Sequence, residues 1–211
     1  MNNNTVDTVK DTQSKSVESK PNLVVFTGPM FAGKSTKLIN CYMESTHPKE
    51  NKAVFKYAKD TRYSKEAEIV THSNQRIPCY MITKCHEINQ YLTPDITEIY
   101  LDEAQFFSSD IFDWLKTFIS QSSNIENIYL AGLNLDARGM VFSTAFNDVI
   151  DMLADECHLL YATCHICKDK ATHTALISNE YNQQMENGTN ILIGGGDIYQ
   201  PVCQTHFIKS L

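Results

Sequence analysis

Short apolar runs recur along most of the chain, separated by longer segments of mixed character. Four of them are rich in β-branched and aromatic residues and are typical of buried strands in a parallel sheet, at 22–28, 53–58, 98–103 and 127–133. The first, NLVVFTG, ends in glycine, and the third, EIYLDE, ends in two acidic residues. Both endings fit parallel strands, because the loops that follow such strands lie at the same edge of the sheet.

Between these runs, apolar residues recur with the spacing of amphipathic helices. One helical face carries Leu38, Ile39, Tyr42 and Met43, and His47-Pro48 is expected to end that helix. A second face carries Ile111, Phe112, Leu115, Phe118 and Ile119. The alternation predicts an α/β fold whose parallel sheet has helices on both faces.

The remaining segments lack this alternation. Residues 1–21 are polar and predict a disordered tail, and residues 59–76 predict a loop or hairpin. From Cys157 onward the pattern predicts a β-hairpin, an exposed loop at 178–190 and a short C-terminal helix. We therefore expect a tail at 1–21, an α/β domain at 22–156 and a smaller domain at 157–211.

Composition narrows the function classes. The net charge is −7, with 25 acidic against 18 basic residues, which disfavours a surface that follows a nucleic-acid backbone. No apolar run approaches the roughly 18 residues needed to span a membrane. The tail has no arginine and no apolar run, so it resembles neither a transit peptide nor a secretory signal. We expect a cytoplasmic protein.

The segment GPMFAGKST, at 28–36, has the spacing of a phosphate-binding P-loop. Gly28 and Gly33 permit a tight path on which backbone N–H groups converge on phosphate oxygens. Lys34 adds a positive charge, and the Ser35 hydroxyl can bind Mg²⁺. A strand is predicted before the motif and a helix after it, which is the context that a genuine P-loop requires.

Asp102 and Glu103 end the third apolar run. Asp102 stands where a second Mg²⁺ ligand is expected, since the carboxyl ends of parallel strands meet at one edge of the sheet. Glu103 is a candidate general base that would take the proton of an acceptor hydroxyl. The alternative is that Glu103 orients water in an ordinary NTPase, and the motif alone leaves both open.

Four residues near the C-terminus have the spacing of a zinc site. Cys164 and Cys167 form one pair, and Cys203 and His206 form a second. Two-residue spacing lets one tight turn present both ligands, and a Cys₃His set fills a tetrahedral coordination sphere. This arrangement predicts a structural Zn²⁺ rather than disulfides, because the cysteine number is odd and the expected compartment is reducing. The alternative is two unrelated sets of buried cysteines.

Together, GPMFAGKST, YAKDTRYS (57–64), DEAQFF (102–107) and IGGGDIYQPVC (193–203) resemble segments of the zinc-containing type II thymidine kinases, in the same order. The resemblance covers about residues 22 to 208. It implies a P-loop NTPase-like parallel sheet with a small C-terminal zinc-binding hairpin and lasso loop. It also implies Mg²⁺-dependent transfer of the γ-phosphoryl group of ATP to the 5′-hydroxyl of thymidine, giving dTMP for nucleotide salvage, and also to that of deoxyuridine.

The resemblance also implies site residues. The catalytic residues would be Glu103 and Arg62. The Mg²⁺ ligands would be Ser35, Asp102 and Asp60. The ATP phosphates contact Gly28, Pro29, Met30, Phe31, Ala32, Gly33, Lys34, Ser35 and Thr36. The nucleoside contacts Met30, Phe106, Leu133, Thr174, Leu192, Ile193, Gly194 and Tyr199, although Phe106 could instead be a plain core aromatic. Family members are similar in forming tetramers and in being inhibited by the end-product triphosphate, dTTP.

Two positions depart from the family pattern. Ala137 stands where members usually carry an aromatic residue of the substrate pocket, so the pocket is expected to be wider there. Leu176 stands where members usually carry an arginine, which removes a positive charge near the lasso loop.

Three other functions compete with a kinase. A non-catalytic nucleotide-binding or scaffold protein is favoured by Ala137 and Leu176, and opposed by the intact Lys34, Asp102 and Glu103. A zinc-ribbon nucleic-acid binder that uses ATP is opposed by the acidic charge balance. A generic NTPase would hydrolyse ATP without a nucleoside, whereas turnover by a kinase depends on one.

Overall fold

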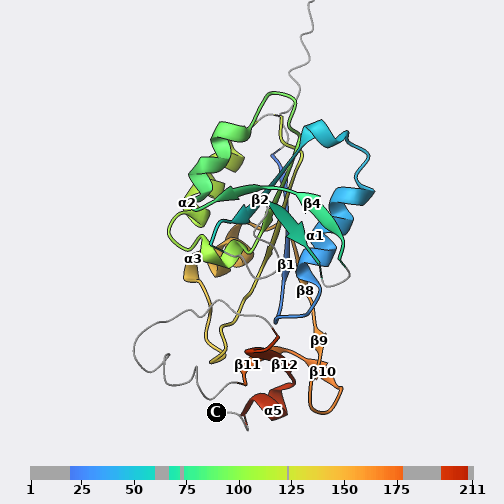
Figure 1. Cartoon of the computed structure of the whole chain (residues 1–211). Helices are drawn as coiled ribbons and strands as arrows, with labels where there is room; N and C mark the ends of the chain where they lie inside the picture. Colours follow the sequence, from blue (N-terminus) through green and yellow to red (C-terminus); the bar gives the residue numbers. More distant parts are fainter. Residues whose placement is uncertain (1–19, 60–66, 72–73, 123, 178–195, 209–211) are drawn as a thin grey trace, which may run out of the picture.

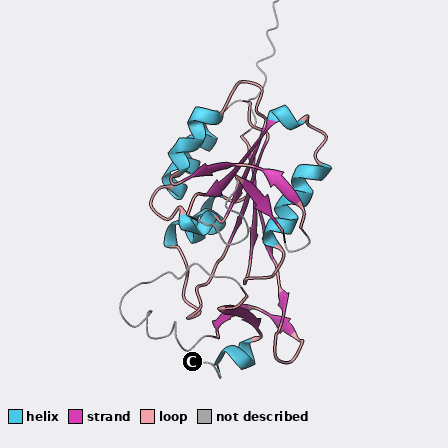
Figure 2. Cartoon of the chain, viewed as in Figure 1, coloured by secondary structure: helices cyan, strands magenta, loops and turns pink. Residues whose placement is uncertain are grey.

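The computed structural model describes residues 20–59, 67–71, 74–122, 124–177 and 196–208. Its centre is a six-stranded parallel sheet (Figures 1 and 2). The strand order is β5 (Tyr80–Ile82), β2 (Lys52–Tyr57), β6 (Glu98–Asp102), β7 (Asn127–Gly132), β1 (Asn22–Thr27) and β8 (Glu156–Leu159). Strands β6 and β1 are adjacent to β7 on either side, so the loops after β1 and β6 open at the same edge of the sheet.

Helices cover both faces of the sheet (Figure 1). On one face lie α1 (Lys34–Glu44) and the antiparallel hairpin of β3 (Glu68–Val70) and β4 (Arg76–Pro78). On the other face lie α2 (Ile111–Gln121), α3 (Thr144–Asp148), a π-helical turn η4 (Val149–Leu153) and the 3₁₀ helix η2 (Cys85–Tyr91). A short 3₁₀ turn, η1 (Lys49–Asn51), leads into β2.

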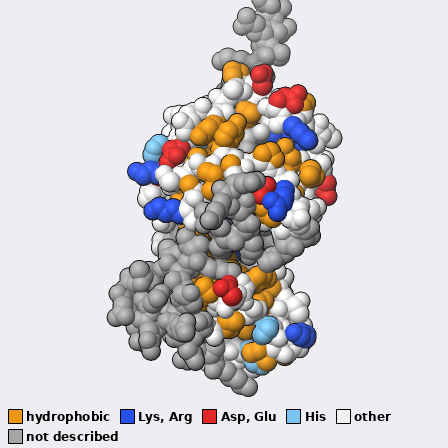
Figure 3. Space-filling model, in the orientation of Figure 1, with side chains coloured by type: hydrophobic (Ala, Val, Ile, Leu, Met, Phe, Trp, Pro, Cys, Tyr) orange, Lys and Arg blue, Asp and Glu red, His pale blue; other side chains and the backbone are white. Residues whose placement is uncertain are grey.

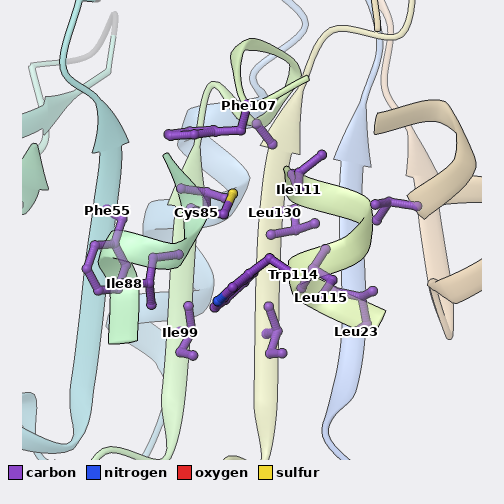
Figure 4. Close-up of a cluster of buried hydrophobic side chains, with 14 of the residues drawn as sticks. Leu23, Phe55, Cys85, Ile88, Ile99, Phe107, Ile111, Trp114, Leu115 and Leu130 are labelled. Atoms are coloured by element: carbon purple, nitrogen blue, oxygen red, sulfur yellow. The ribbon is translucent and has the colours of Figure 1, made fainter. Parts of the chain in front are cut away.

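The two faces of the sheet bury separate apolar clusters. Along β1, Leu23 and Val25 face the α2 side, whereas Val24 and Phe26 face the α1 side, as the period of a strand requires. Figure 4 shows the larger cluster, in which Trp114 of α2 lies over the sheet. Burial of this apolar surface is the main stabilising contribution to the sheet and its helices.

A smaller region follows β8 (Figure 1). It consists of β9 (Ala162–Thr163), β10 (Lys170–Ala171), β11 (His173–Leu176), β12 (Tyr199–Val202) and α5 (Gln204–Ile208). The pairs β9–β10 and β11–β12 are antiparallel. Its own core is small and contains Cys164, Ala171, Ala175, Val202 and Phe207, which is little apolar area to stabilise a separate unit.

The predicted α/β class with a parallel sheet is confirmed, and each of the four predicted strands is present within one residue of its expected bounds. The prediction that Met43 lies on the buried face of α1 is wrong, because its side chain is 57% exposed. The hairpin predicted from Cys157 begins only at β9, since Cys157 lies in β8 and pairs with Val25. The division of the chain into domains at residue 157 stays a prediction.

The predicted loop or hairpin at 59–76 contains β3 in its described part, and the strand that pairs with it, β4, begins at the last residue of that segment and extends to Pro78. The short C-terminal helix is present as α5. The tail and the loop at 178–190 lie outside the described residues, apart from residues 20 and 21 of the tail. None of the helices in the described part of the chain has the length and apolarity that crossing a membrane requires.

Candidate active site

The loop between β1 and α1 follows an unusual backbone path. Gly28 has φ 137°, and a Cβ added there would lie 2.2 Å from the carbonyl oxygen of Leu160. Gly33 has φ 81° and Phe31 has φ 64°, both in the left-handed region. The chain therefore needs glycine at residue 28 for space and at residue 33 for conformation, as a phosphate-binding loop does.

Helix α1 begins at the end of this loop, at Lys34. Its first backbone hydrogen bond runs from Lys37 N–H to Gly33 O at 2.9 Å. The N–H groups of the first turn have no partner within the helix, so they and the helix dipole favour an anion at this end. Lys34 Nζ donates to Pro29 O at 2.7 Å, which keeps the ammonium group over the loop.

Ser35 and Asp102 meet across the edge of the sheet. Ser35 Oγ donates to Asp102 Oδ1 at 3.1 Å, although the two residues lie 67 positions apart in the sequence. Adjacent oxygens around an octahedral Mg²⁺ with bonds of about 2.1 Å are separated by about 3.0 Å. The separation of the pair therefore fits two neighbouring positions of a magnesium coordination sphere, and the assignment of both residues to Mg²⁺ stays a prediction.

Asp102 is almost fully buried, at 5% exposure. Burial, and next the Glu103 carboxylate, raise the pKa of Asp102 to about 7. Lys56, the Cα partner of Asp102 on β2, is also buried and opposes this rise. A buried carboxylate directly next to a second carboxylate favours a cation beside the pair.

Glu103 is placed by a sharp change of backbone direction at the end of β6. It has φ 57° and ψ 40° and precedes the 3₁₀ turn η3 (Ala104–Phe106). The left-handed conformation is uncommon for glutamate and is a form of local strain that concentrates at functional sites. Glu103 Oε2 accepts a hydrogen bond from Gln105 Nε2 at 2.6 Å. Asp102 thus contacts Ser35 of α1, and the adjacent Glu103 carboxylate is held by Gln105.

An apolar cluster includes Met30 and Phe31 of the loop between β1 and α1. Its buried members are Met30, Leu133, Ile198 and Tyr199, and Phe31, Ala137, Phe142 and Leu176 pack around them. Three of the predicted nucleoside contacts, Met30, Leu133 and Tyr199, therefore come together. A fourth, Thr174, accepts a hydrogen bond from Met30 N–H at 2.9 Å. Ala137 and Leu176, the two departures from the family pattern, both border this cluster.

Phe106 lies at the edge of this cluster. Its ring stacks on Tyr57 at 5.1 Å and meets Phe142 edge-on at 5.5 Å. Phe142, which sequence reasoning missed, therefore connects Phe106 to the cluster. Its signal was weak, because a single aromatic residue in a loop of mixed polarity has no periodic context. Gln105 was also missed, although a polar residue between Ala104 and two phenylalanines is an unusual pattern.

Five predicted site residues lie outside the described part of the chain. They are Asp60, Arg62, Leu192, Ile193 and Gly194. Their roles stay predictions that rest on the resemblance.

The two predicted pairs of zinc ligands come together in the smaller region. The ligand atoms of Cys164, Cys167, Cys203 and His206 all lie within 4.8 Å of one another. Cys167 Sγ and Cys203 Sγ are 3.7 Å apart, and Cys203 Sγ lies 3.2 Å from His206 Nδ1. Zn–S bonds of about 2.3 Å in a tetrahedron separate two sulfurs by about 3.8 Å. The cluster therefore fits a closed tetrahedral site with no open position for a substrate.

Basic side chains do not gather in one strip on the visible, described part of the surface in Figure 3. This distribution gives no support to the nucleic-acid alternative.

Comparison with known proteins agrees with this geometry. The family model described as thymidine kinase matches residues 21–207. A protein named thymidine kinase from Aster yellows witches'-broom phytoplasma (strain AYWB) is 34% identical over 185 residues, which cover 86% of this chain and 84% of that protein. A protein of the same name from Onion yellows phytoplasma (strain OY-M) is 34% identical over the same shares of the two chains.

Proposed function

This chain belongs to the thymidine kinase family, and we propose that it transfers the γ-phosphoryl group of ATP to the 5′-hydroxyl of thymidine, giving dTMP and ADP. Deoxyuridine, which lacks only the 5-methyl group, is proposed as a second acceptor. The observation that carries the proposal is the position of Glu103. Glu103 directly follows Asp102 in the sequence, and its backbone N–H donates to Asp102 Oδ1. Asp102 in turn accepts a hydrogen bond from Ser35 of the proposed phosphate loop.

In the proposed reaction, the 5′-oxygen forms a bond to the γ-phosphorus while the bond from that phosphorus to the β–γ bridging oxygen breaks. Glu103 takes the proton that the hydroxyl loses, and ADP leaves with the electron pair of the broken bond. The ammonium group of Lys34, the phosphate loop and the proposed Arg62 stabilise the negative charge on the transferring group. The remaining loop residues, from Gly28 to Thr36, hold the phosphates in position.

Two metal ions belong to the proposal. Ser35, Asp102 and the proposed Asp60 would hold Mg²⁺, which supplies positive charge to the β- and γ-phosphate oxygens when bound. Cys164, Cys167, Cys203 and His206 would hold a structural Zn²⁺. Because the smaller region has little apolar core, a metal cross-link would supply much of its stability.

The nucleoside pocket is proposed to be the apolar cluster around Met30, Leu133 and Tyr199, with Phe106 at its edge. Apolar walls and a few directed hydrogen bonds suit a small planar pyrimidine. Ile198 packs in the same cluster and directly precedes Tyr199. The proposed backbone contacts from Leu192, Ile193 and Gly194 would supply directed hydrogen bonds.

Further parts of the proposal rest on the resemblance to the family. They are a homotetrameric assembly, feedback inhibition by dTTP and a cytoplasmic location. Gel filtration with light scattering tests the first, and inhibition assays with dTTP test the second.

The test is ATP consumption with Mg²⁺ in the presence of thymidine, deoxyuridine, deoxycytidine or a purine deoxynucleoside. The variant Glu103→Gln removes the base at constant size, and Glu50→Gln, at an exposed surface position, controls for loss of one negative charge. We expect turnover that depends on thymidine, falls by about 10²–10⁴-fold in Glu103→Gln and is unchanged in Glu50→Gln.

Two outcomes would contradict the proposal. ATP hydrolysis that ignores every nucleoside would identify a generic NTPase. Binding of nucleotide without any turnover, in folded and zinc-loaded protein, would identify the non-catalytic alternative.

A further inference from the structure

We propose that Gln105 is a positioning residue whose side-chain amide fixes the Glu103 carboxylate relative to the backbone of Leu133. The amide thereby sets the spacing between the group that accepts the proton and the wall of the nucleoside pocket. This inference rests on the proposed function, because it assigns Gln105 to the same site.

Two hydrogen bonds hold the amide. Gln105 Nε2 donates to Glu103 Oε2 at 2.6 Å, and Gln105 Oε1 accepts from the backbone N–H of Leu133 at 3.0 Å. A backbone N–H can only donate, so the amide oxygen must face Leu133 and the NH₂ group must face Glu103. The orientation of the amide is therefore fixed by chemistry, and it suits an ionised carboxylate.

The backbone conformation explains why the side chain of Gln105 contacts the carboxylate of Glu103, two positions earlier in the sequence. Glu103 is in the left-handed conformation, and Phe106 N–H donates to Glu103 O at 3.1 Å, which closes the turn η3. The turn reverses the chain directly after β6, so the side chain of Gln105 points back toward Glu103 and toward β7.

Packing leaves the amide no alternative position. Gln105 is 1% exposed, so an amide group without partners would be costly there. A Cβ added at Gly132 would lie 2.9 Å from Gln105 Oε1 and 2.7 Å from Cε1 of Phe146. The side chain is thus enclosed by β7 and α3, and glycine at residue 132 is what makes room for it.

The contact of the Gln105 amide with Leu133 links the amide to the proposed nucleoside pocket. Leu133 is a buried member of the apolar cluster with Met30 and Tyr199. One amide therefore connects the carboxylate that would accept the 5′-hydroxyl proton to the residue that would contact the base. Reacting groups must be held within fractions of an ångström, and a misplacement of about 1 Å can cost about 10²-fold in rate.

Two variants separate the two hydrogen bonds. Gln105→Glu keeps an acceptor for Leu133 N–H but replaces the donor to Glu103 with a second carboxylate. Gln105→Met keeps a similar volume and removes both hydrogen bonds. Gln121→Glu, at the exposed end of α2, is the control for the added charge.

We expect Gln105→Glu to lower kcat at least about tenfold with KM for thymidine changed less than about twofold. We expect Gln105→Met to lower kcat and also to raise KM, while Gln121→Glu behaves as the unaltered protein. Equal kinetic constants in all four proteins would overturn the inference. So would a loss of kcat that simply follows a lower melting temperature, because that pattern describes packing alone.

A crystal structure of Gln105→Met provides a readout that does not need turnover. The inference requires the Glu103 side chain to leave the rotamer that it has in the unaltered protein, and an unchanged rotamer would overturn it. If the unaltered protein does not phosphorylate thymidine, the proposed function fails, and the rotamer still decides whether Gln105 positions Glu103.

Discussion

The backbone N–H of Met30 donates to the hydroxyl oxygen of Thr174 at 2.9 Å. This hydrogen bond joins the loop between β1 and α1 to β11, 144 positions later in the sequence, and both residues are buried. The region that carries the proposed zinc ligands is therefore attached to the loop that is proposed to hold ATP. Met30 itself packs against Leu133 and Tyr199, so the attachment lies where the proposed phosphate and nucleoside sites meet.

Replacing Thr174 by valine should weaken this connection. The two side chains have nearly the same shape, but valine leaves the buried N–H of Met30 without its acceptor, which costs about 1–3 kcal/mol. We expect a lower free energy of unfolding in urea and a higher KM for ATP. Thr174→Ser keeps the hydroxyl and should retain most of both properties. Equal behaviour of Val and Ser variants would mean that the hydroxyl is dispensable.

The contact between Ser35 and Asp102 predicts how the enzyme depends on Mg²⁺. Asp102→Asn keeps the shape of the side chain and removes the negative charge, so the cation should bind less tightly. We expect the Mg²⁺ concentration for half-maximal turnover to rise at least about tenfold, which corresponds to about 1.4 kcal/mol. Asp113→Asn, on the exposed face of α2, removes the same charge at a distance. Identical Mg²⁺ titrations of the two variants would exclude Asp102 as a ligand.

Removal of the metal should change the number of reactive thiols. Cys157 is an exposed residue and should react with a thiol reagent in the folded, zinc-loaded protein, although partial burial raises the pKa of its thiol and slows the reaction. Cys79 and Cys85 are buried, and burial raises the pKa of the Cys79 thiol to about 12, so its reactive thiolate is scarce at pH 8.

A strong chelator should release one zinc ion per chain and add three reactive thiols, those of Cys164, Cys167 and Cys203. Metal analysis and thiol titration of the same sample measure both numbers. Reaction of the thiols of Cys164, Cys167 and Cys203 before chelation would contradict the proposed site. So would a chain that holds no zinc after purification in the presence of zinc.

The sequence allowed much of this arrangement to be predicted. Strands β1, β2, β6 and β7 are apolar because both faces of the sheet are covered, so each stands out as a short run. Asp102 and Glu103 could be placed because they end such a run. The ligand pairs Cys164–Cys167 and Cys203–His206 could be joined because their spacing suits only a few kinds of site.

Other features depend on tertiary contacts that leave little trace in the sequence. Every residue of β8 is exposed at the edge of the sheet, so this strand has no apolar run to reveal it. Strand β5 has only three residues. The contact of Gln105 with both Glu103 and Leu133 depends on the left-handed backbone of Glu103, which no local pattern predicts for a glutamate.

Ala137 offers a test of how the pocket sets specificity. Ala137 packs at the border of the cluster that contains Met30 and Tyr199, and a phenylalanine there would bury more apolar surface against a bound base. We expect Ala137→Phe to strengthen thymidine binding by about 1–3 kcal/mol and to weaken acceptance of nucleosides with large 5-substituents. Calorimetric titration with thymidine and a 5-substituted series measures both. Unchanged affinities throughout the series would place residue 137 outside the pocket.

Gly139 connects this pocket border to the proposed zinc region. It has φ 74°, and a Cβ added there would lie 2.8 Å from Cε1 of Phe207, whose ring stacks on His173 at 4.4 Å. Phe207 directly follows the proposed zinc ligand His206. Gly139 belongs to the turn that is closed by the bridge between Leu135 and Val141 and that also carries Ala137. Phe207 should therefore help to hold that turn in place.

Gly139→Ala should be more destabilising than Gly33→Ala, although both residues have positive φ. A left-handed alanine costs about 1–2 kcal/mol, and at Gly33 nothing lies within 4 Å of the added Cβ. At Gly139 the contact with Phe207 adds about 1–3 kcal/mol of overpacking. At about 2–4 °C per kcal/mol, we expect the melting temperature to fall by roughly 4–20 °C in Gly139→Ala and by roughly 2–8 °C in Gly33→Ala.

A double variant separates conformational strain from the clash. Phe207→Leu combined with Gly139→Ala removes the ring that the new Cβ would meet, so the two changes should cost less together than the sum of their separate effects. Strict additivity would show that Phe207 does not support the turn. If Phe207 does support the turn, Gly139→Ala should also raise KM for thymidine more than KM for ATP. The reason is that the displaced turn contains Ala137, whereas the proposed phosphate loop is a different segment.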